Sequence, residues 1–327
     1  MIISQTPYRI SFFGGGTDYP AWYRKYRGAT LATSINKYCY LFCRYLPPFF
    51  EHKHRIVYTN IELIDEVNQI KHPAVKGVMS YLGIQKGVEI QHHGDLPARA
   101  GMGSSSAFTV GLLNALTALE NCQKSKKELA ELAIHIEQNV ICEVVGSQDQ
   151  LATAMGGINR LDFKSDNTFS VTPIEVSPYR LVSLEKRLLL FFTGFQRYAS
   201  EIAKQQIENF DKKKKELETL LDLVDHGQKI LTDESLDIEQ FGHILHEGWM
   251  IKRGFAECIS TPFIDDVYDR ALKAGAIGGK ILGAGGGGFL ALFVHPQDQE
   301  RVIYELKDLV HIPFKFEFNG TRILSYA

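Results

Sequence analysis

The loop at residues 97–107 combines glycines and serines immediately before an apolar run that is typical of a helix. Glycines let the backbone approach a ligand closely, and the first turn of a helix presents unpaired N–H groups at the positive end of its dipole. Such a loop favours an anion such as a phosphate group, although a serine-rich helix cap without a ligand is the alternative. The residues concerned are Arg99, Ala100, Gly101, Met102, Gly103, Ser104, Ser105 and Ser106.

A second loop has glycine at five of the six positions of residues 283–288. It matches the spacing G-x-G-x-x-G, but that dinucleotide-binding fingerprint must open a helix, whereas residues 289–294 are apolar and typical of a strand. The context therefore argues against a dinucleotide site. So many glycines cost conformational entropy that a simple turn does not require, which indicates close approach of the backbone to another element or to a ligand.

A third loop follows Arg9, which lies on a predicted strand, and turns at the glycines of residues 14–16 to present Thr17 and Asp18. A carboxylate in such a loop can accept hydrogen bonds from the hydroxyl groups of a sugar. Asp18 can equally cap a helix that begins near Pro20. The local sequence leaves these two interpretations open.

Strands and helices of mixed order must position these three loops, as the spacing of apolar residues predicts. A capping pair, Ser125 and Glu128, marks the start of one helix. Strict strand–helix alternation is absent, so the pattern favours an α+β fold over a doubly wound parallel sheet. The predicted strands are residues 7–13, 28–35, 37–46, 87–92, 187–193, 289–294, 314–318 and 321–326, and the predicted helices are residues 105–120, 126–145, 199–231, 236–258, 263–274 and 297–309.

The composition narrows the class of protein. The 327 residues carry 36 basic and 38 acidic side chains, a formal net charge of −2, which argues against a general nucleic-acid binder. Five cysteines without a C-x-x-C pair indicate neither a zinc site nor a disulfide framework, and free thiols suit a reducing compartment. No apolar run reaches the roughly 20 residues that a membrane-spanning helix needs. We therefore expect a cytoplasmic protein of two domains, divided near residue 185, with no nucleic-acid or membrane partner.

In their order and spacing, the three loops resemble the motifs of the GHMP kinases, the superfamily of galactokinase, homoserine kinase and mevalonate kinase. The similarity extends over nearly the whole chain and includes residues 146–150, between the second and third motifs of that family. It implies an α+β fold with a ribosomal-protein-S5-like N-terminal domain over residues 1–185 and a ferredoxin-like C-terminal domain over residues 186–327. It also implies an enzyme that transfers a phosphoryl group from ATP to an alcohol.

The resemblance further implies roles for individual residues. Asp149 corresponds to the aspartate that faces the acceptor hydroxyl, and Arg9 to the basic residue beside it. Ser105 and Glu137 correspond to ligands of Mg²⁺, so ATP and Mg²⁺ are the implied cofactors. Residues 99–106 would bind the ATP phosphates. The implied sugar-binding residues are Gly16, Thr17, Asp18, Gly285 and Gly286.

Within the superfamily, residues 14–18 resemble the D-glycero-D-manno-heptose 7-phosphate kinases and the kinase domain of fucokinases. Galactokinases have Glu and His where this chain has Gly15 and Gly16. The implied reaction is phosphorylation of the anomeric hydroxyl of a sugar or sugar phosphate, with heptose 7-phosphate as the leading substrate. A kinase for L-fucose or a hexose, a non-catalytic ligand sensor, and a homodimer all stay open.

A phosphorylated substrate would need cationic side chains near the site. Arg99 is one of them, and it stands where many GHMP kinases have glycine, so it either constrains the loop or adds a charge near a phosphate. Each candidate also fits a solvated surface. The candidates are Arg27, Lys37, Arg99, Lys252 and Arg253.

Overall fold

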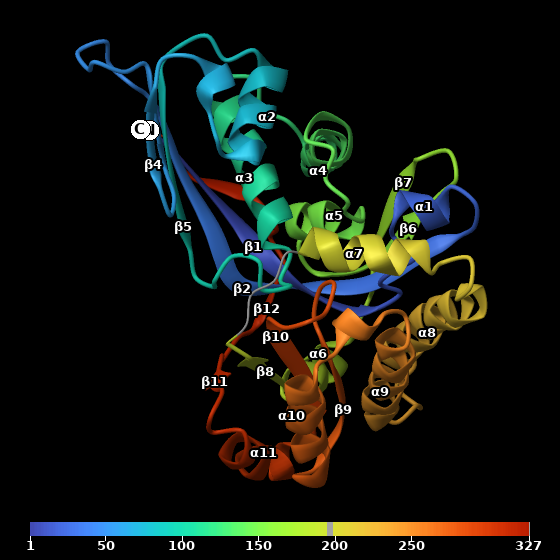
Figure 1. The fold of residues 1–327 in the computed structure, drawn as a ribbon. Helices are drawn as coiled ribbons and strands as arrows, with labels where there is room; N and C mark the ends of the chain where they lie inside the picture. Colours follow the sequence, from blue (N-terminus) through green and yellow to red (C-terminus); the bar gives the residue numbers. More distant parts are fainter. Residues whose placement is uncertain (195–198, 327) are drawn as a thin grey trace.

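The computed structural model describes residues 1–194 and 199–326, whose strands form two β-sheets (Figure 1). The larger sheet consists of β1 (Ile2–Phe13), β2 (Gly28–Tyr45), β3 (His54–Val57), β4 (Ile61–Ile64), β5 (Val88–Gly94), β6 (Ile158–Phe163), β7 (Phe169–Pro173), β12 (Phe316–Glu317) and β13 (Arg322–Tyr326). Its main order is β13-β1-β2-β5-β3-β4, with β12 and β6 paired to β2 and β7 paired to β6. The pairs are antiparallel except β3 with β5.

The strand β2 joins two segments that the sequence predicts as separate strands. Pro7 of β1 pairs with Tyr38, but the next residue, Tyr8, pairs with Ile35, so residues 36–37 form a bulge. Proline lacks the N–H group that a regular ladder needs and is found at such irregularities. One long bulged strand therefore replaces the predicted pair.

Helices cover one face of the larger sheet (Figure 1): α2 (Pro73–Leu82), α3 (Ser104–Leu119), α4 (Lys126–His135) and α5 (Gln148–Met155). The α3 helix agrees with the prediction, and because its residues are buried from Ser106 to Ala118 it forms the centre of this layer. The predicted capping box of Ser125 and Glu128 is confirmed. The predicted helix over residues 126–145 is too long, because α4 passes into a π-helical turn at Ile136–Val140 and then ends.

The smaller sheet has the antiparallel order β11-β8-β10-β9 and consists of β8 (Leu188–Phe192), β9 (Ala276–Ile281), β10 (Phe289–Val294) and β11 (Val310–His311). Its interior face is apolar, and α9 (Glu239–Arg253) and α10 (Pro262–Lys273) pack on it. The remaining helices are α1 (Pro20–Tyr23), α6 (Pro178–Glu185), α7 (Ala199–Glu208), α8 (Lys214–Thr232) and α11 (Gln299–Glu305). The predicted helix over residues 199–231 is thus two helices, α7 and α8. The mixed architecture confirms the predicted α+β class.

The chain returns to the larger sheet at its end. In β13, Tyr326 pairs with Ile2 of β1, so the two ends of the chain lie side by side (Figure 1). The division near residue 185 stays a prediction, and it assigns β12 and β13 to the second half although both pair with strands of the larger sheet. No helix within residues 1–194 and 199–326 is long and apolar enough to cross a membrane.

Candidate active site

Arg9 and Asp149 form a bidentate ion pair between β1 and the first turn of α5. The Nε atom of Arg9 donates to Oδ1 of Asp149 at 2.8 Å, and Nη2 donates to Oδ2 at 2.9 Å. The Arg9 side chain is 2% exposed, whereas the Asp149 side chain is 27% exposed. The buried guanidinium therefore holds the carboxylate in place, and the carboxylate stays partly accessible to a ligand. This parallel geometry fixes the orientation of the carboxylate and is stronger than a single hydrogen bond.

The same arginine connects this ion pair to the 97–107 loop. Its Nη1 donates to the carbonyl oxygen of Gly101 at 2.7 Å, and its backbone N–H donates to that of Met102 at 3.1 Å. Beyond this loop α3 begins after Gly103, and its first intrahelical bond is Ala107 N–H to Gly103 O at 2.8 Å. The N–H groups of the preceding turn, residues 104–106, are thus the orphan donors of a 16-residue helix beside Asp149. They form an anion-binding site of the kind that phosphate groups use.

Within the 97–107 loop the residues act in different ways. Ala100 and Met102 are fully buried and shape the loop through their carbonyl groups, which accept hydrogen bonds from Phe289 and Arg9. Arg99 has a φ of +58°, the left-handed conformation that favours glycine, and its N–H donates to the Ser104 hydroxyl at 3.1 Å. The loop thus holds Arg99 in a left-handed conformation, at a cost of roughly 1–2 kcal/mol.

The 283–288 loop packs directly against the 97–107 loop. A methyl group on Gly101 would lie 2.3 Å from the carbonyl oxygen of Leu282, and one on Gly283 would lie 2.5 Å from the Cα atom of Gly101. These close backbone contacts explain the glycine content that the sequence analysis could not assign to a turn. The loop joins β9 to β10 and opens no helix, which confirms the argument against a dinucleotide site.

Two of the glycines predicted to bind the sugar are used by the protein itself. The N–H of Gly286 donates to the carbonyl oxygen of Ile259 at 2.7 Å, and Gly285 packs against the same residue. These contacts fasten the 283–288 loop to the segment before α10 and occupy the N–H of Gly286. A sugar-binding role for Gly285 and Gly286 stays a prediction.

In the glycine turn that follows β1, Gly16 and Thr17 also form hydrogen bonds within the protein. Thr17 is fully buried, its hydroxyl lies 2.7 Å from Gly14 O and accepts the N–H of Ala29, and it fastens the turn to β2 rather than facing a ligand. The N–H of Gly16 is taken by Oδ1 of Asp18 at 2.9 Å. Asp18 is itself buried, with 1% of the residue exposed, so its contact with a sugar stays a prediction.

Asp18 does not cap a helix. The residue before α1 is Tyr19, and no side chain caps that helix, which rules out the alternative that the sequence left open. Burial raises the pKa of Asp18, and the negative charge of Asp149 adds to this effect while the charge of Arg9 opposes it. Asp18, Asp149 and Arg9 therefore lie close enough for their charges to interact.

The serine that hydrogen-bonds to Glu137 is Ser106, the residue after the predicted metal ligand Ser105. Ser106 Oγ donates to Oε2 of Glu137 at 3.0 Å, whereas the Ser105 side chain is exposed. Successive residues of a helix point about 100° apart, so only one of two adjacent serines can face the same neighbour. The predicted metal-ligand role of Ser105 stays a prediction, and Ser106 is a further candidate beside Glu137.

Glu137 lies in the π-helical turn after α4, and its carboxyl group is almost fully buried, with 1% of the residue exposed. Burial raises its pKa to about 7, although hydrogen bonds from Gln150 and Ser106 favour the ionised form. The Oε1 atom of Glu137 and the Oε1 atom of Gln150 are both buried without a hydrogen-bond partner among the described residues. A carboxylate, a hydroxyl and an amide oxygen form a donor set that fits a hard cation such as Mg²⁺. Unpartnered oxygens of this kind are costly unless a ligand satisfies them.

Two lysines at the site have roles that the sequence analysis did not assign. Lys252, at the end of α9, and Lys280, on β9, are 8% and 7% exposed. Lys252 was one of five candidate cations and was equally compatible with a solvated helix face. The signal for Lys280 is a lysine within an otherwise apolar strand that leads into the 283–288 loop.

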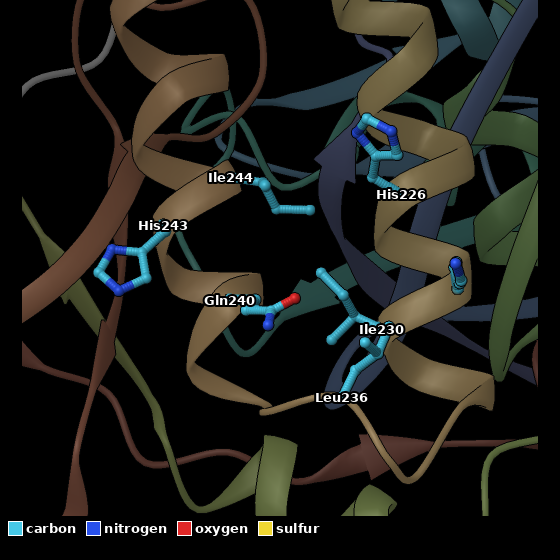
Figure 2. Close-up of a pocket in the computed structure, with 7 residues that line it drawn as sticks. His226, Ile230, Leu236, Gln240, His243 and Ile244 are labelled. Carbon is cyan, nitrogen blue, oxygen red and sulfur yellow. The ribbon is translucent and has the colours of Figure 1, made fainter.

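A groove between α8 and α9 lies outside this cluster (Figure 2). Ile230 and Leu236 occupy the space between the two helices, with Gln240 facing them from α9. None of the residues predicted for the site lines it, so we assign it no part in catalysis. Its lining consists of His226, Lys229, Ile230, Leu236, Gln240, His243 and Ile244.

Comparison with protein families gives two matches. Residues 68–157 match the model of the GHMP kinases N terminal domain, and residues 231–311 match the GHMP kinases C terminal model. Together they cover just over half of the chain. The first includes Asp149, Glu137 and the 97–107 loop, and the second includes Lys252 and the 283–288 loop.

Comparison with individual proteins agrees with the family models. The chain is 29% identical over 321 residues to the D-glycero-alpha-D-manno-heptose 7-phosphate kinase of Campylobacter jejuni, covering 94% of this chain and 93% of the relative. It is 28% identical over 322 residues to the galactokinase of Pyrococcus furiosus, covering 88% and 87%. The crystal structure of a D-glycero-D-manno-heptose 1-phosphate kinase from Bacteriodes thetaiotaomicron superimposes with a TM-score of 0.75 at 25% identity, covering all of both chains.

Proposed function

The chain belongs to the GHMP kinases, a family of ATP-dependent phosphotransferases, and we propose that it transfers the γ-phosphoryl group of ATP to the anomeric hydroxyl of D-glycero-D-manno-heptose 7-phosphate. The observation that carries the proposal is the accessible Asp149 carboxylate, held by buried Arg9 next to the N-terminus of α3. The likeness to heptose kinases over the whole chain supports the choice of sugar.

Phosphoryl transfer depends on positioning and on charge stabilisation more than on covalent chemistry. In our proposal, the N–H groups at the start of α3 bind the ATP phosphates, and Asp149 accepts the proton of the anomeric hydroxyl. The two hydrogen bonds from Arg9 orient the Asp149 carboxylate toward the acceptor hydroxyl. Asp18 binds a hydroxyl group of the sugar.

The oxygen atoms beside α3 are proposed to hold Mg²⁺, through Ser106 and Glu137 with the side-chain oxygen of Gln150. When bound, this ion neutralises charge on the phosphate oxygens. The structure supports the donor set through the two unpartnered oxygens of Glu137 and Gln150. ATP and Mg²⁺ are thus the cofactors of the proposed reaction.

The proposal is tested by the rate of ATP consumption with a panel of free sugars and sugar phosphates. We expect D-glycero-D-manno-heptose 7-phosphate to be turned over with the highest kcat/KM. Preferential turnover of L-fucose or galactose would retain the kinase and reject the heptose. ATP binding without turnover of any sugar would favour the ligand sensor.

Replacing Ser106 should change the Mg²⁺ requirement. We expect Ser106→Ala to raise the Mg²⁺ concentration for half-maximal activity about 10- to 100-fold, because the cation loses an oxygen and Glu137 loses the hydroxyl that orients it. Ser105→Ala should change it little, since the Ser105 side chain is exposed. Titration of Mg²⁺ at saturating ATP distinguishes the two. A larger effect at Ser105 than at Ser106 would contradict the site geometry.

The elevated pKa of Glu137 makes the stability of the metal-free protein depend on pH. Its pKa is about 7 in the folded chain and 4.5 by reference, so the folded state holds a proton that the unfolded state releases. The contribution of this proton to the free energy of unfolding is complete below the reference pKa and is lost as the pH rises through about 7. We expect thermal unfolding without Mg²⁺ to shift to lower temperature between about pH 5 and pH 8. Glu137→Gln should lack this component, and an unchanged pH dependence in that variant would remove Glu137 as its source.

A further inference from the structure

Lys252 brings a buried ammonium group to the junction of the three glycine loops. It lies in the last turn of α9, and its Nζ donates to the carbonyl oxygen of Gly283. Lys280 lies close by on β9 and donates to the carbonyl oxygen of Phe12 at 2.8 Å. Two lysines from the smaller sheet and its helix thus contact the 283–288 loop and the end of β1.

Neither lysine forms an ion pair with a carboxylate among the residues that the structure describes. Each ammonium has three donors, and one backbone carbonyl satisfies only one of them. A buried cation without an anionic partner is costly. Burial lowers the pKa of Lys252 to about 8, partly opposed by Asp18, so Lys252 stays charged at neutral pH. Burial and the charge of Lys252 also hold the pKa of Lys280 well below its usual range.

A small pocket brings this cationic pair next to the glycine turn that follows β1. The two lysines line it together with the end of β1 and the glycine turn that leads to Asp18. Gly15, which has no side chain, also lines this pocket, whose volume is about 10 Å³. The remaining lining residues are Phe12, Phe13, Gly14, Leu220 and Gly248.

The other positive groups of the site already have partners. Arg9 is neutralised by Asp149, and the ATP phosphates are assigned to the N-terminus of α3 and the oxygen donors beside it. The charge of Lys252 is therefore available to a second anion. Asp18 is the carboxylate with the largest effect on the pKa of Lys252, but Asp18 already accepts a hydrogen bond from Gly16.

We propose that Lys252 is a specificity-determining residue of the acceptor site, where its ammonium group binds the anionic group of a phosphorylated sugar and selects it over the free sugar. Lys280 lies behind it and adds positive potential once an anion is bound. This inference rests on the proposed function, because it names the class of acceptor for the same site. It also gives a role to two buried lysines that line one small pocket without an acidic partner among the described residues.

A purely structural role is the competing explanation, since the bond to Gly283 ties α9 to the 283–288 loop. Arg253 provides a matched control, because it is the next residue along α9 and carries the same charge. Its guanidinium is 31% exposed and is paired with Asp265 at 3.2 Å, which removes it as a candidate cation for the substrate. Arg253→Met therefore changes the net charge equally without touching the pocket.

The test compares kcat/KM for D-glycero-D-manno-heptose 7-phosphate and for the free heptose in the wild type, Lys252→Met, Lys252→Arg and Arg253→Met. In Lys252→Met we expect the preference for the phosphorylated sugar to fall about 10²-fold, because a buried charge pair loses one partner. Lys252→Arg should restore part of the preference, and Arg253→Met should keep it. Binding of heptose 7-phosphate without ATP, measured by calorimetry, should weaken in parallel in Lys252→Met.

A Lys252→Met variant that loses activity equally on both sugars would overturn the inference in favour of the structural role. So would a wild type that does not prefer the phosphorylated sugar, although sugar kinase activity would then stand. If the wild type turned over neither sugar, the proposed function would fail. Calorimetry would still decide on Lys252, since equal affinity of the wild type and Lys252→Met for heptose 7-phosphate would exclude it as the anion-binding residue.

Discussion

Asp149→Asn is expected to lower kcat about 10²- to 10⁴-fold, the contribution typical of a general base, while the affinity for ATP changes little. An asparagine keeps the size of the side chain and one hydrogen-bond acceptor toward Arg9, but it cannot take up the proton of the acceptor hydroxyl. The ATP phosphates are bound by the start of α3 and not by Asp149, so nucleotide binding should be retained. Single-turnover rates and calorimetric titration with a non-hydrolysable ATP analogue measure the two effects separately.

The free energy of unfolding of Asp149→Asn is the control measurement. Asp149 is 27% exposed and lies in the first turn of α5, so the fold should survive its replacement. Near-wild-type kcat would remove Asp149 from the chemistry. A large loss of ATP affinity with unchanged kcat would instead place Asp149 in nucleotide binding.

Gly101→Ala is expected to destabilise the protein by about 3–5 kcal/mol and to abolish activity, because an overpacked site with a strained backbone is among the most damaging single changes. Gly101 has a φ of +82°, which costs an alanine about 1–2 kcal/mol. Its new methyl group would also lie 2.3 Å from the Leu282 carbonyl oxygen, so the 97–107 and 283–288 loops must separate. The same movement would displace the Gly101 carbonyl group from Arg9.

Gly83→Ala isolates the backbone component of that effect. Gly83 also has a positive φ, +63°, but it ends α2 and nothing lies within 4 Å of an added methyl group. Urea unfolding of both variants should show a cost near 1–2 kcal/mol for Gly83→Ala and a larger one for Gly101→Ala. Equal costs would mean that the contact between the two loops contributes nothing to stability.

The sequence predicts the fold class and the order of the site elements well because both depend on local patterns. Apolar spacing places α3 within one residue of its observed bounds, and the capping box of Ser125 marks α4 correctly. Arg9 and Asp149 are 140 residues apart in the sequence. Their pairing is predicted by the resemblance to the GHMP kinases and not by any local pattern. The π-helical turn after α4 has no comparable pattern, so the predicted helix there is too long.

The direction of side chains is what the sequence does not predict. Adjacent serines 105 and 106 look equivalent in the sequence, but the rotation of α3 brings only Ser106 to Glu137. Gly286 looks available for a sugar until its N–H is found on Ile259. Lys252 looks like part of a solvated helix face because its burial depends on the 283–288 loop, more than 30 residues later in the chain. Each case concerns a contact that only the packing of distant segments determines.

The central claim is that this site phosphorylates the anomeric hydroxyl of heptose 7-phosphate. It is tested most directly by ³¹P and ¹³C NMR of the product formed from ATP, Mg²⁺ and D-glycero-D-manno-heptose 7-phosphate. We predict a second phosphorus signal coupled to the anomeric proton and carbon, with the original phosphate unchanged, and no such product from Asp149→Asn. Phosphate on a different carbon, or the same product rate from Asp149→Asn as from the wild type, would contradict the account.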